Sequence, residues 1–237
     1  MRRGLRRPRS LLAFPSEAGE AAVDEVGRGC LACEVVAAAV ILPPLSPEDV
    51  ELLDPLTRSR MQDVQDSKLM SSKKRQEVAA FIQSYVADNV SRVAAFGIGT
   101  ASASEIDRIN IRQATMMAMH RALDDVSSKA PVRKITVDGN SFVPYLDVPH
   151  ECVVKGDASC LNVAAASILA KVHRDALVRE HCSTDPTLHD RYGFNENKAY
   201  GTRAHLDGLQ RYGASVHHRA SFAPVAAAVS TRARHVE

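Results

Sequence analysis

Short apolar runs recur along the chain, separated by glycine, proline and acidic residues. These runs have the length of buried strands, and most are rich in alanine and β-branched side chains. They predict strands over residues 21–25, 34–42, 91–99, 132–139 and 151–157. Only a short turn joins the first two, so they should be neighbours in one sheet, which favours a mixed sheet over a purely parallel one.

Stretches with helical spacing alternate with these runs. Residues 71–90 place apolar side chains on one helical face, and the alanine-rich residues 161–178 suit a helix that packs closely. Ser46 before a proline is a typical helix start, and we expect Ser104 to cap a long helix. Residues 203–212 predict a last short helix. The alternation of strands and helices predicts an α/β layered fold.

Charge is distributed unevenly over the 237 residues, although the formal net charge is only +2. Residues 1–16 contain five arginines and no acid, so the rest of the chain carries slightly more acids than bases. Total charge therefore gives no basic footprint for a nucleic acid. A polyanionic ligand would have to be held by local arrangement or by bound cations. No apolar run reaches the length of a membrane helix, so no membrane partner is expected.

The N-terminal segment, residues 1–20, is Arg-rich and lacks the apolar core of a secretory signal. It is either a disordered basic tail or an organellar presequence, and the sequence leaves both open. The five cysteines are odd in number, which fits a reducing compartment better than a disulfide framework. We expect an intracellular protein, cytoplasmic or, if the segment is a presequence, mitochondrial.

Four acids lie at the expected ends of strands, beside glycines: Asp24, Glu25, Asp138 and Asp157. In open α/β sheets chemistry collects beyond strand ends. Two carboxylates 4 Å apart repel by about 4 kcal/mol at an effective dielectric of 20, so a shared cleft needs a counter-charge. Oxygen donors suit Mg²⁺ or Mn²⁺, and two such ions suit displacement at phosphorus. The alternative is that each acid simply faces water.

Asp24 and Glu25 are consecutive and should point to opposite faces of a strand. Both reach one site only if the strand ends or bends at Glu25. Gly27 and Gly29 permit such a turn and let backbone amides approach a ligand closely. Arg28 adds a charged donor fork between them.

Motifs in the same order along the chain resemble those of the type 2 ribonucleases H, the ribonuclease HII family. They are V-D-E-V-G-R-G (23–29), D-S-K (66–68), G-I-G-T-A-S-A-S-E-I-D-R-I-N-I-R-Q-A-T (97–115), V-D-G-N (137–140), V-V-K-G-D-A-S (153–159), A-A-A-S-I-L-A-K-V-H-R-D (164–175), Y-G-T (200–202) and H-R-A-S-F (218–222). The resemblance implies a catalytic domain over residues 21–225 and a C-terminal tail over 226–237. It also implies a ribonuclease H-like fold, with a mixed five-stranded sheet flanked by helices and a helical C-terminal portion.

The implied activity is two-metal hydrolysis of RNA in RNA/DNA hybrids, with incision at single ribonucleotides in duplex DNA, leaving 3′-hydroxyl and 5′-phosphate ends. The resemblance makes Asp24, Glu25, Asp138 and Asp157 the metal-binding catalytic acids. Nucleic-acid contacts would come from Gly27, Arg28, Gly29 and Tyr200, with Lys68, Lys155 and Lys198 as phosphate contacts. A monomer suffices. Two alternatives stay open: a catalytically weak hybrid-binding protein, and another nuclease of the same fold.

The chain departs from the family pattern after the glycine-arginine-glycine turn, where Cys30, Cys33 and Glu34 stand. The C-x-x-C pair has three interpretations: inert thiols, a reversible disulfide that perturbs the turn, or an adventitious metal site. Asn197 and Ala199 also depart from the family and bear on the placement of Tyr200. His217 and His218 have no metal partner by spacing and are interpreted as surface or loop residues.

Overall fold

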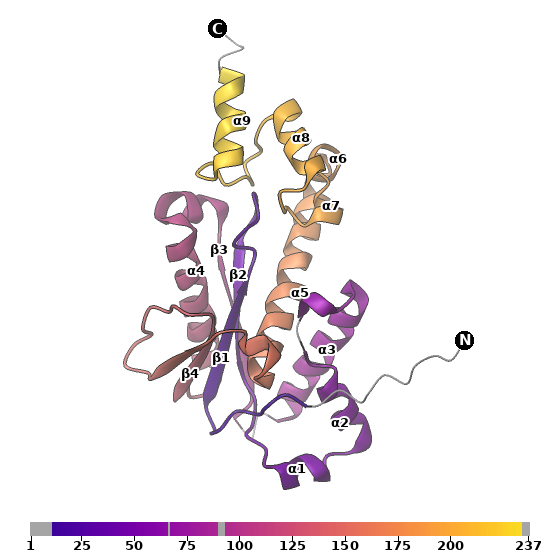
Figure 1. Cartoon of the computed structure of the whole chain (residues 1–237), viewed down its shortest axis with the longest axis vertical. Helices are drawn as coiled ribbons and strands as arrows, with labels where there is room; N and C mark the ends of the chain where they lie inside the picture. The colour runs from indigo at the N-terminus through magenta and orange to yellow at the C-terminus, as the bar shows by residue number, and fades with distance from the viewer. Residues whose placement is uncertain (1–10, 66, 90–92, 234–237) are drawn as a thin grey trace, which may run out of the picture.

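A twisted sheet of five strands runs through the middle of the molecule, with helices on both sides (Figure 1). The computed structural model describes residues 11–65, 67–89 and 93–233. The strand order is β3-β2-β1-β4-β5. The strands are β1 (Glu20–Val26), β2 (Val35–Ile41), β3 (Ala95–Ala101), β4 (Lys134–Asp138) and β5 (His150–Val153). β1–β2 and β2–β3 pair antiparallel, while β1–β4 and β4–β5 pair parallel, so the predicted mixed sheet is confirmed.

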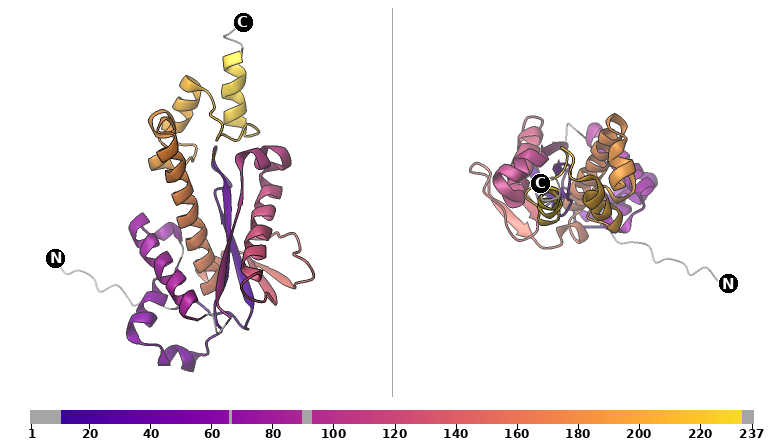
Figure 2. Two further views of the ribbon diagram at one scale, coloured as in Figure 1. Left: turned by 180° about the vertical axis from the view of Figure 1, so that it is seen from behind. Right: turned by 90° about the horizontal axis from the view of Figure 1, so that it is seen from above.

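Helices cover the two faces of the sheet unequally, as the two ribbon views show (Figure 2). One face carries α4 (Ala103–Ser127), and the other carries α3 (Ser72–Asp88) and α5 (Leu161–Thr184). Before α3 come α1 (Pro47–Leu52) and α2 (Pro55–Gln62), and two 3-10 turns, η1 (Ser67–Leu69) and η3 (Gly156–Ala158), precede α3 and α5. The C-terminal helices are α6 (Thr187–Tyr192), α7 (Phe194–Asn197), α8 (Arg203–Tyr212) and α9 (Ala223–Ala233).

β2 is buried along its whole length and divides its side chains between two apolar cores. Ala37, Ala39 and Ile41 pack in the core under α4, whereas Val36 and Ala38 pack in the core under α3 and α5. Alternate residues of a strand point to opposite faces, so one apolar run supplies both layers. The third core joins the loop after β1 to α5 and the C-terminal helices.

Two expected boundaries shift in the structure. The N-cap of α4 is Ser102, not Ser104, because Ser102 and Glu105 form a reciprocal capping box that satisfies the first turn. The strand expected over 91–99 is β3, which starts at Ala95 and continues to Ala101; residues 90–92 lie outside the described residues. The Ser46 cap and the helix over 203–212 are confirmed.

Part of the expected N-terminal tail is tied to the body of the protein. Leu11, Leu12 and Phe14 pack against the core under α3 and α5, and the backbone N–H of Ala13 donates to the carbonyl of Ser159 at 3.0 Å. The tail expected over 1–20 is therefore structured in its second half, because its apolar residues find a core to cover. Residues 1–10 lie outside the described residues.

The boundary expected at residue 225 falls inside α9, which continues to Ala233. Residues 226–233 of the expected C-terminal tail are therefore helical, and residues 234–237 lie outside the described residues. Within the ranges that the structure describes, no helix is long and apolar enough to span a membrane.

We expect Gly99→Ala to lower the free energy of unfolding by about 3 kcal/mol, since overpacking of a tight interface costs this much. A Cβ at this position of β3 would meet the Ala118 carbonyl oxygen at 2.0 Å and the Ala122 nitrogen at 2.4 Å, both on α4. Urea denaturation measures the loss. Gly29→Ala is the matched control, because an added Cβ there has no neighbour within 4 Å. Equal stability of the two variants would contradict the close approach of α4 to the sheet.

Candidate active site

The parallel pairing of β1 with β4 places two acids side by side at one edge of the sheet. Val23 pairs with Val137, so Asp24 and Asp138 are the next residues of adjacent strands. Both line a cavity of 270 Å³ together with Glu25. A second cavity of 510 Å³ adjoins it, and the two share Glu25, Asp138 and Arg28. Three of the four predicted acids therefore meet at the end of the sheet.

Asp24 and Glu25 both reach the first cavity, but not through an early strand end. β1 keeps its pairing with β2 through Val26, so the strand does not end at Glu25. Instead, the buried Asp24 carboxylate turns along the backbone, and its Oδ1 accepts from the N–H of Glu25 at 2.7 Å. The Glu25 carboxylate accepts from Arg28 Nη1 at 3.1 Å. Local hydrogen bonds thus draw both side chains toward one site.

Asp157 joins the group by a different route from the one expected. β5 ends at Val153, and Asp157 lies in η3, so it does not end a strand. The N–H of Gly156 donates to Asp138 Oδ1 at 2.8 Å, which fixes η3 against the end of β4. The buried Asp157 carboxylate lies 3.3 Å from Lys68 Nζ, and Lys68 lines the first cavity. The turn, not the strand, therefore carries the fourth acid.

Burial and mutual repulsion raise the pKa of the three acids that line the cavities. Burial, the Glu25 charge and the Asp138 charge raise the pKa of Asp24 to about 8, against a hydrogen bond from Ser167. The pKa of Glu25 is raised by burial and by Asp138, although Arg28 opposes this. Burial also raises the pKa of Asp138, with a smaller contribution from Asp157. The cations that line the cavity, Arg28, Lys68 and Lys171, therefore do not offset the burial and repulsion of these three acids.

This donor set fits a hard divalent cation. The four acids supply carboxylate oxygens, the ligands that Mg²⁺ and Mn²⁺ prefer, and the raised pKa values of Asp24, Glu25 and Asp138 report charge that is not fully compensated. Among the described residues, no three of these carboxylates bring oxygens within 4.8 Å of one another. Like charges without an ion stay apart, so shared coordination requires the side chains to close inward.

Two buried arginines hold the loop after β1 from behind. Arg174 of α5 donates to the carbonyls of Glu34 and Ala32 at 3.1 and 3.3 Å, and Arg219 donates to the carbonyls of Cys33 and Arg28, each at 3.0 Å. These hydrogen bonds hold the carbonyls of the loop in place and so stabilise its turn. Val26, Gly27 and the half-exposed Arg28 line the cavity at the start of this loop.

Gly27 is required at the start of this loop. Its φ is +93°, and an added Cβ would lie 2.3 Å from Nε of Arg174. A side chain would therefore meet both backbone strain and a buried guanidinium. Gly29 has open space instead. The sequence predicted a turn at both glycines, but the structure shows that only the first is needed for packing.

Tyr200 stands at the rim of the first cavity with 39% of its surface exposed. Lys171 Nζ and Arg174 Cζ lie 5.5 and 5.7 Å from its ring centroid, so two cations border the aromatic face. Asn197 accepts from the Ala199 N–H at 2.8 Å and fixes the turn before the tyrosine. The departures at 197 and 199 therefore still leave the ring at the site.

The three predicted phosphate lysines separate in the structure. Lys68 lines the first cavity, whereas Lys155 and Lys198 line neither cavity. Lys155 is exposed in a left-handed turn. Lys198 Nζ donates to the Asn195 carbonyl, and burial lowers the pKa of Lys198. Sequence position alone did not distinguish Lys68 from the other two.

Two residues of α5 that were not singled out also line the cavity. Ser167 and Lys171 are four residues apart and so share a helical face. Lys171 pairs with Asp175 at 2.7 Å, and Arg75 of α3 lies 3.7 Å from the same carboxylate. In the sequence, the two polar residues four positions apart in the otherwise apolar run A-A-A-S-I-L-A-K were the feature that could have identified this helical face.

Both cysteines of the C-x-x-C pair are free and buried. Burial raises the pKa of Cys30, and burial with the Glu34 charge raises the pKa of Cys33 to about 12. A thiol attacks as its thiolate, so these surroundings disfavour the reversible disulfide. His218 lies in the loop between α8 and α9, but it is buried and not at the surface, and its Nε2 lies 2.9 Å from Nε2 of His205.

Comparisons with known proteins agree with this arrangement. The family model described as Ribonuclease HII matches residues 21–225. A ribonuclease HII from Rhodospirillum rubrum is 46% identical over 213 residues, covering 90% of this chain and 88% of the relative. A ribonuclease HII from Jannaschia sp. is 42% identical over 206 residues, covering 87% and 90%.

Solved structures show the same fold. The ribonuclease H2 from Pyrococcus horikoshii OT3 has a TM-score of 0.66 at 20% identity and covers 89% of this chain and 97% of that one. Bst-RNase HIII in complex with Mn²⁺ has a TM-score of 0.57 at 15% identity and covers 92% and 72%. The ribonuclease H-like fold with a mixed five-stranded sheet is thereby confirmed.

We expect Asp24→Asn to raise the melting temperature of the metal-free protein at pH 8. The folded-state pKa of Asp24, about 8, exceeds its ordinary value of 3.8. The contribution of Asp24 to the free energy of unfolding is therefore fully present below pH 3.8 and is lost as the pH rises toward 8. An amide does not ionise and escapes this loss. Each kcal/mol corresponds to about 2–4 °C in a chain of this size.

Melting curves in chelator at pH 4 and pH 8 measure this difference. The variant and the wild type should melt alike at pH 4, and Asp190→Asn on exposed α6 should follow the wild type at both pH values. A variant that melts below the wild type at pH 8 would show that the Asp24 charge is already compensated.

Proposed function

The chain belongs to the ribonuclease HII family, which makes it a ribonuclease H, and we propose that it cuts the RNA strand of RNA/DNA hybrids and incises duplex DNA at single embedded ribonucleotides. One observation carries the proposal. Gly27 and Arg28 of the loop after β1 line the same cavity as the buried Asp24 and the partly buried Glu25 and Asp138. A backbone reader of ribose and a site for cations are thus adjacent.

Recognition of the ribose follows from the loop held by Arg174 and Arg219. The 2′-hydroxyl distinguishes RNA from DNA and is both a donor and an acceptor. The backbone of Gly27, Arg28 and Gly29 would contact it without reading a base, since backbone groups are the same at every sequence. The half-exposed Arg28 guanidinium would lie against the neighbouring phosphate.

Hydrolysis would use Mg²⁺ or Mn²⁺ held by Asp24, Glu25, Asp138 and Asp157. Two such ions supply an activated water and stabilise the leaving oxygen of an in-line displacement. The carboxylates would hold the ions at the scissile phosphate, where water would replace the 3′-oxygen leaving group, so the ends would be a 3′-hydroxyl and a 5′-phosphate. Lys68, 3.3 Å from Asp157, would orient that acid and contact the phosphate.

Tyr200 would read the position next to the ribonucleotide. Its exposed ring offers an aromatic face to a deoxyribose or base, and its hydroxyl offers a donor to a phosphate. Lys155 and Lys198, outside the cavities, would contact the duplex backbone farther from the cut. We infer that the enzyme acts as a monomer inside the cell, because every proposed site residue comes from one chain.

We expect Asp138→Asn to retain the fold and to cut a duplex containing one ribonucleotide at least about a hundredfold more slowly than the wild type, since even outer-shell partners of a metal cost up to this much. The amide keeps the acceptor for the Gly156 N–H but removes a ligand charge. Cleavage rates in Mg²⁺ and in Mn²⁺, with end analysis of the products, measure the effect. Asp190→Asn is the matched control.

The same assay separates the alternatives. A hybrid-binding protein without catalysis would retain hybrid in a gel shift and cut nothing with either ion. Another nuclease of this fold would cut branched DNA that contains no ribose. Unimpaired turnover by Asp138→Asn would contradict the assignment of the acids.

We expect Tyr200→Ala to reduce incision at a single ribonucleotide by about tenfold, since the stacking of one base on an aromatic ring contributes about 1–3 kcal/mol. Cleavage within a long RNA strand should fall less, because many registers are available. Tyr212→Ala, on α8 and outside both cavities, is the control. Equal losses on both substrates would mean that Tyr200 does not read the junction.

A further inference from the structure

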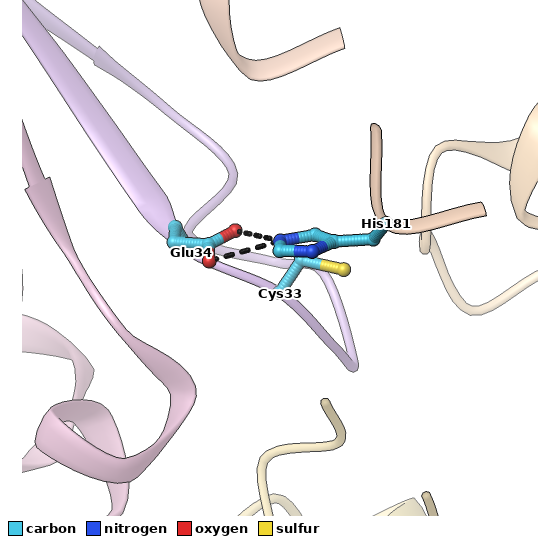
Figure 3. A group of neighbouring side chains, drawn as sticks. All are labelled: Cys33, Glu34 and His181. Atoms are coloured by element: carbon cyan, nitrogen blue, oxygen red, sulfur yellow. Dashed lines mark hydrogen bonds and ion pairs between the residues drawn. The ribbon is translucent and has the colours of Figure 1, made fainter. Parts of the chain in front are cut away.

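A second group of side chains that can bind a metal includes the last two residues of the loop after β1. This recognition loop comprises residues 27–34. Cys33 and Glu34 directly precede β2, and His181 projects from the C-terminal half of α5 (Figure 3). The sulfur, a carboxylate oxygen and an imidazole nitrogen all lie within 4.8 Å of one another. Among the residues that the structure describes, this is the one group of three such donors at that spacing.

We propose that Cys33, Glu34 and His181 bind one Zn²⁺ ion, with water as the fourth ligand. Thiolate, imidazole and carboxylate are the three ligand types that zinc takes in proteins, whereas Mg²⁺ and Mn²⁺ prefer oxygen alone. On binding, the thiol proton of Cys33 passes to solvent and the ion supplies the charge that stabilises the thiolate. Chemistry thus separates this site from the all-carboxylate one.

The distances require only a small closure. Donors about 2.0–2.3 Å from a tetrahedral ion lie about 3.3–3.8 Å from one another. The three donor atoms lie within 4.8 Å of one another, so no pair need close by more than about 1.5 Å. His181 Nε2 already lies 3.0 and 3.1 Å from the two Glu34 oxygens. Rotation about side-chain bonds can supply the rest, since Glu34 and His181 are both partly exposed.

The backbone holds the cysteine in place for this role. Cys33 has a φ of +63°, its N–H donates to the His217 carbonyl at 2.8 Å, and its carbonyl accepts from Arg219 at 3.0 Å. These contacts fix the direction of the thiol. Figure 3 shows the sulfur beside the imidazole, and dashed lines mark the contacts of His181 with Glu34.

The proposed zinc site is open to solvent on one side and closed on the other. The side chains of Glu34 and His181 are 21% and 24% exposed, which gives an ion a path from solvent. Cys33 is 2% exposed and closes the inner side. The His217 ring, whose centroid lies 4.6 Å from that of His181, packs against the third ligand. Cys30 lies elsewhere, with its Sγ 3.8 Å from the Lys198 carbonyl, so C-x-x-C is not the ligand pair.

The ion would join the start of β2 to α5. Arg174 already links these two segments through the Glu34 carbonyl. A bound zinc would add a second link between the same segments, behind the loop that carries Arg28. We therefore expect zinc to stabilise the loop, with the melting temperature rising as the ion binds the folded chain.

Cobalt titration tests the site directly. Co²⁺ replaces zinc, and a thiolate ligand gives it a near-ultraviolet charge-transfer band that carboxylates do not give. Excess Mg²⁺ keeps the carboxylate site occupied. We expect one equivalent of Co²⁺ to produce the band in the full-length wild type, Zn²⁺ to abolish it by displacement, and Zn²⁺ to raise the melting temperature.

Three variants complete the experiment. Cys33→Ser should lose the band, His181→Gln should weaken Co²⁺ binding at least tenfold, and Cys30→Ala should match the wild type. Circular dichroism establishes whether each variant is folded. If Cys33→Ser does not fold, His181→Gln still tests the site. No band in the wild type, or a band that survives Cys33→Ser, would overturn the proposal. Neither result bears on cleavage in Mg²⁺, which tests the carboxylate site.

Discussion

Repulsion between carboxylates that the sheet buries at one edge is the constraint on which this molecule depends. Asp24 lies on β1, the central strand of the sheet, between β2 and β4, and its neighbour Asp138 ends the adjacent strand β4. Water cannot solvate both charges there, so burial and mutual repulsion raise the pKa of each. Cations compensate these charges only if the side chains converge, and convergence is what a two-metal nuclease requires.

The loop after β1 is held in place by residues that lie far from it in the sequence. Arg174 and Arg219 are both fully buried and come from α5 and from the segment before α9. Each uses its guanidinium to bind carbonyls of the loop after β1. The long helix α5 and the C-terminal portion therefore stabilise the loop after β1, although both arginines lie far from it in the sequence.

The proposed zinc site extends the same design. It lies at the outer end of the loop, where Arg174 and Arg219 already bind the backbone of Glu34 and Cys33. The two metal sites differ in ligand chemistry: oxygen alone at the sheet edge, and sulfur, nitrogen and oxygen behind the loop. A hard cation that exchanges with substrate and a retained structural ion can therefore coexist in one chain.

The sequence by itself determined the layers and the membership of the acidic site. Apolar runs with terminal acids fix which strands are buried, and the side-chain period of two fixes which residues face each core, so a mixed sheet and Asp24, Glu25 and Asp138 followed from pattern alone. Tertiary structure decided the rest. Only folding placed Asp157 on a 3-10 turn, separated Lys68 from Lys155, buried His218 and brought His181 to Cys33. These outcomes depend on contacts between different elements of the chain or on turn geometry, and no local periodicity encodes either.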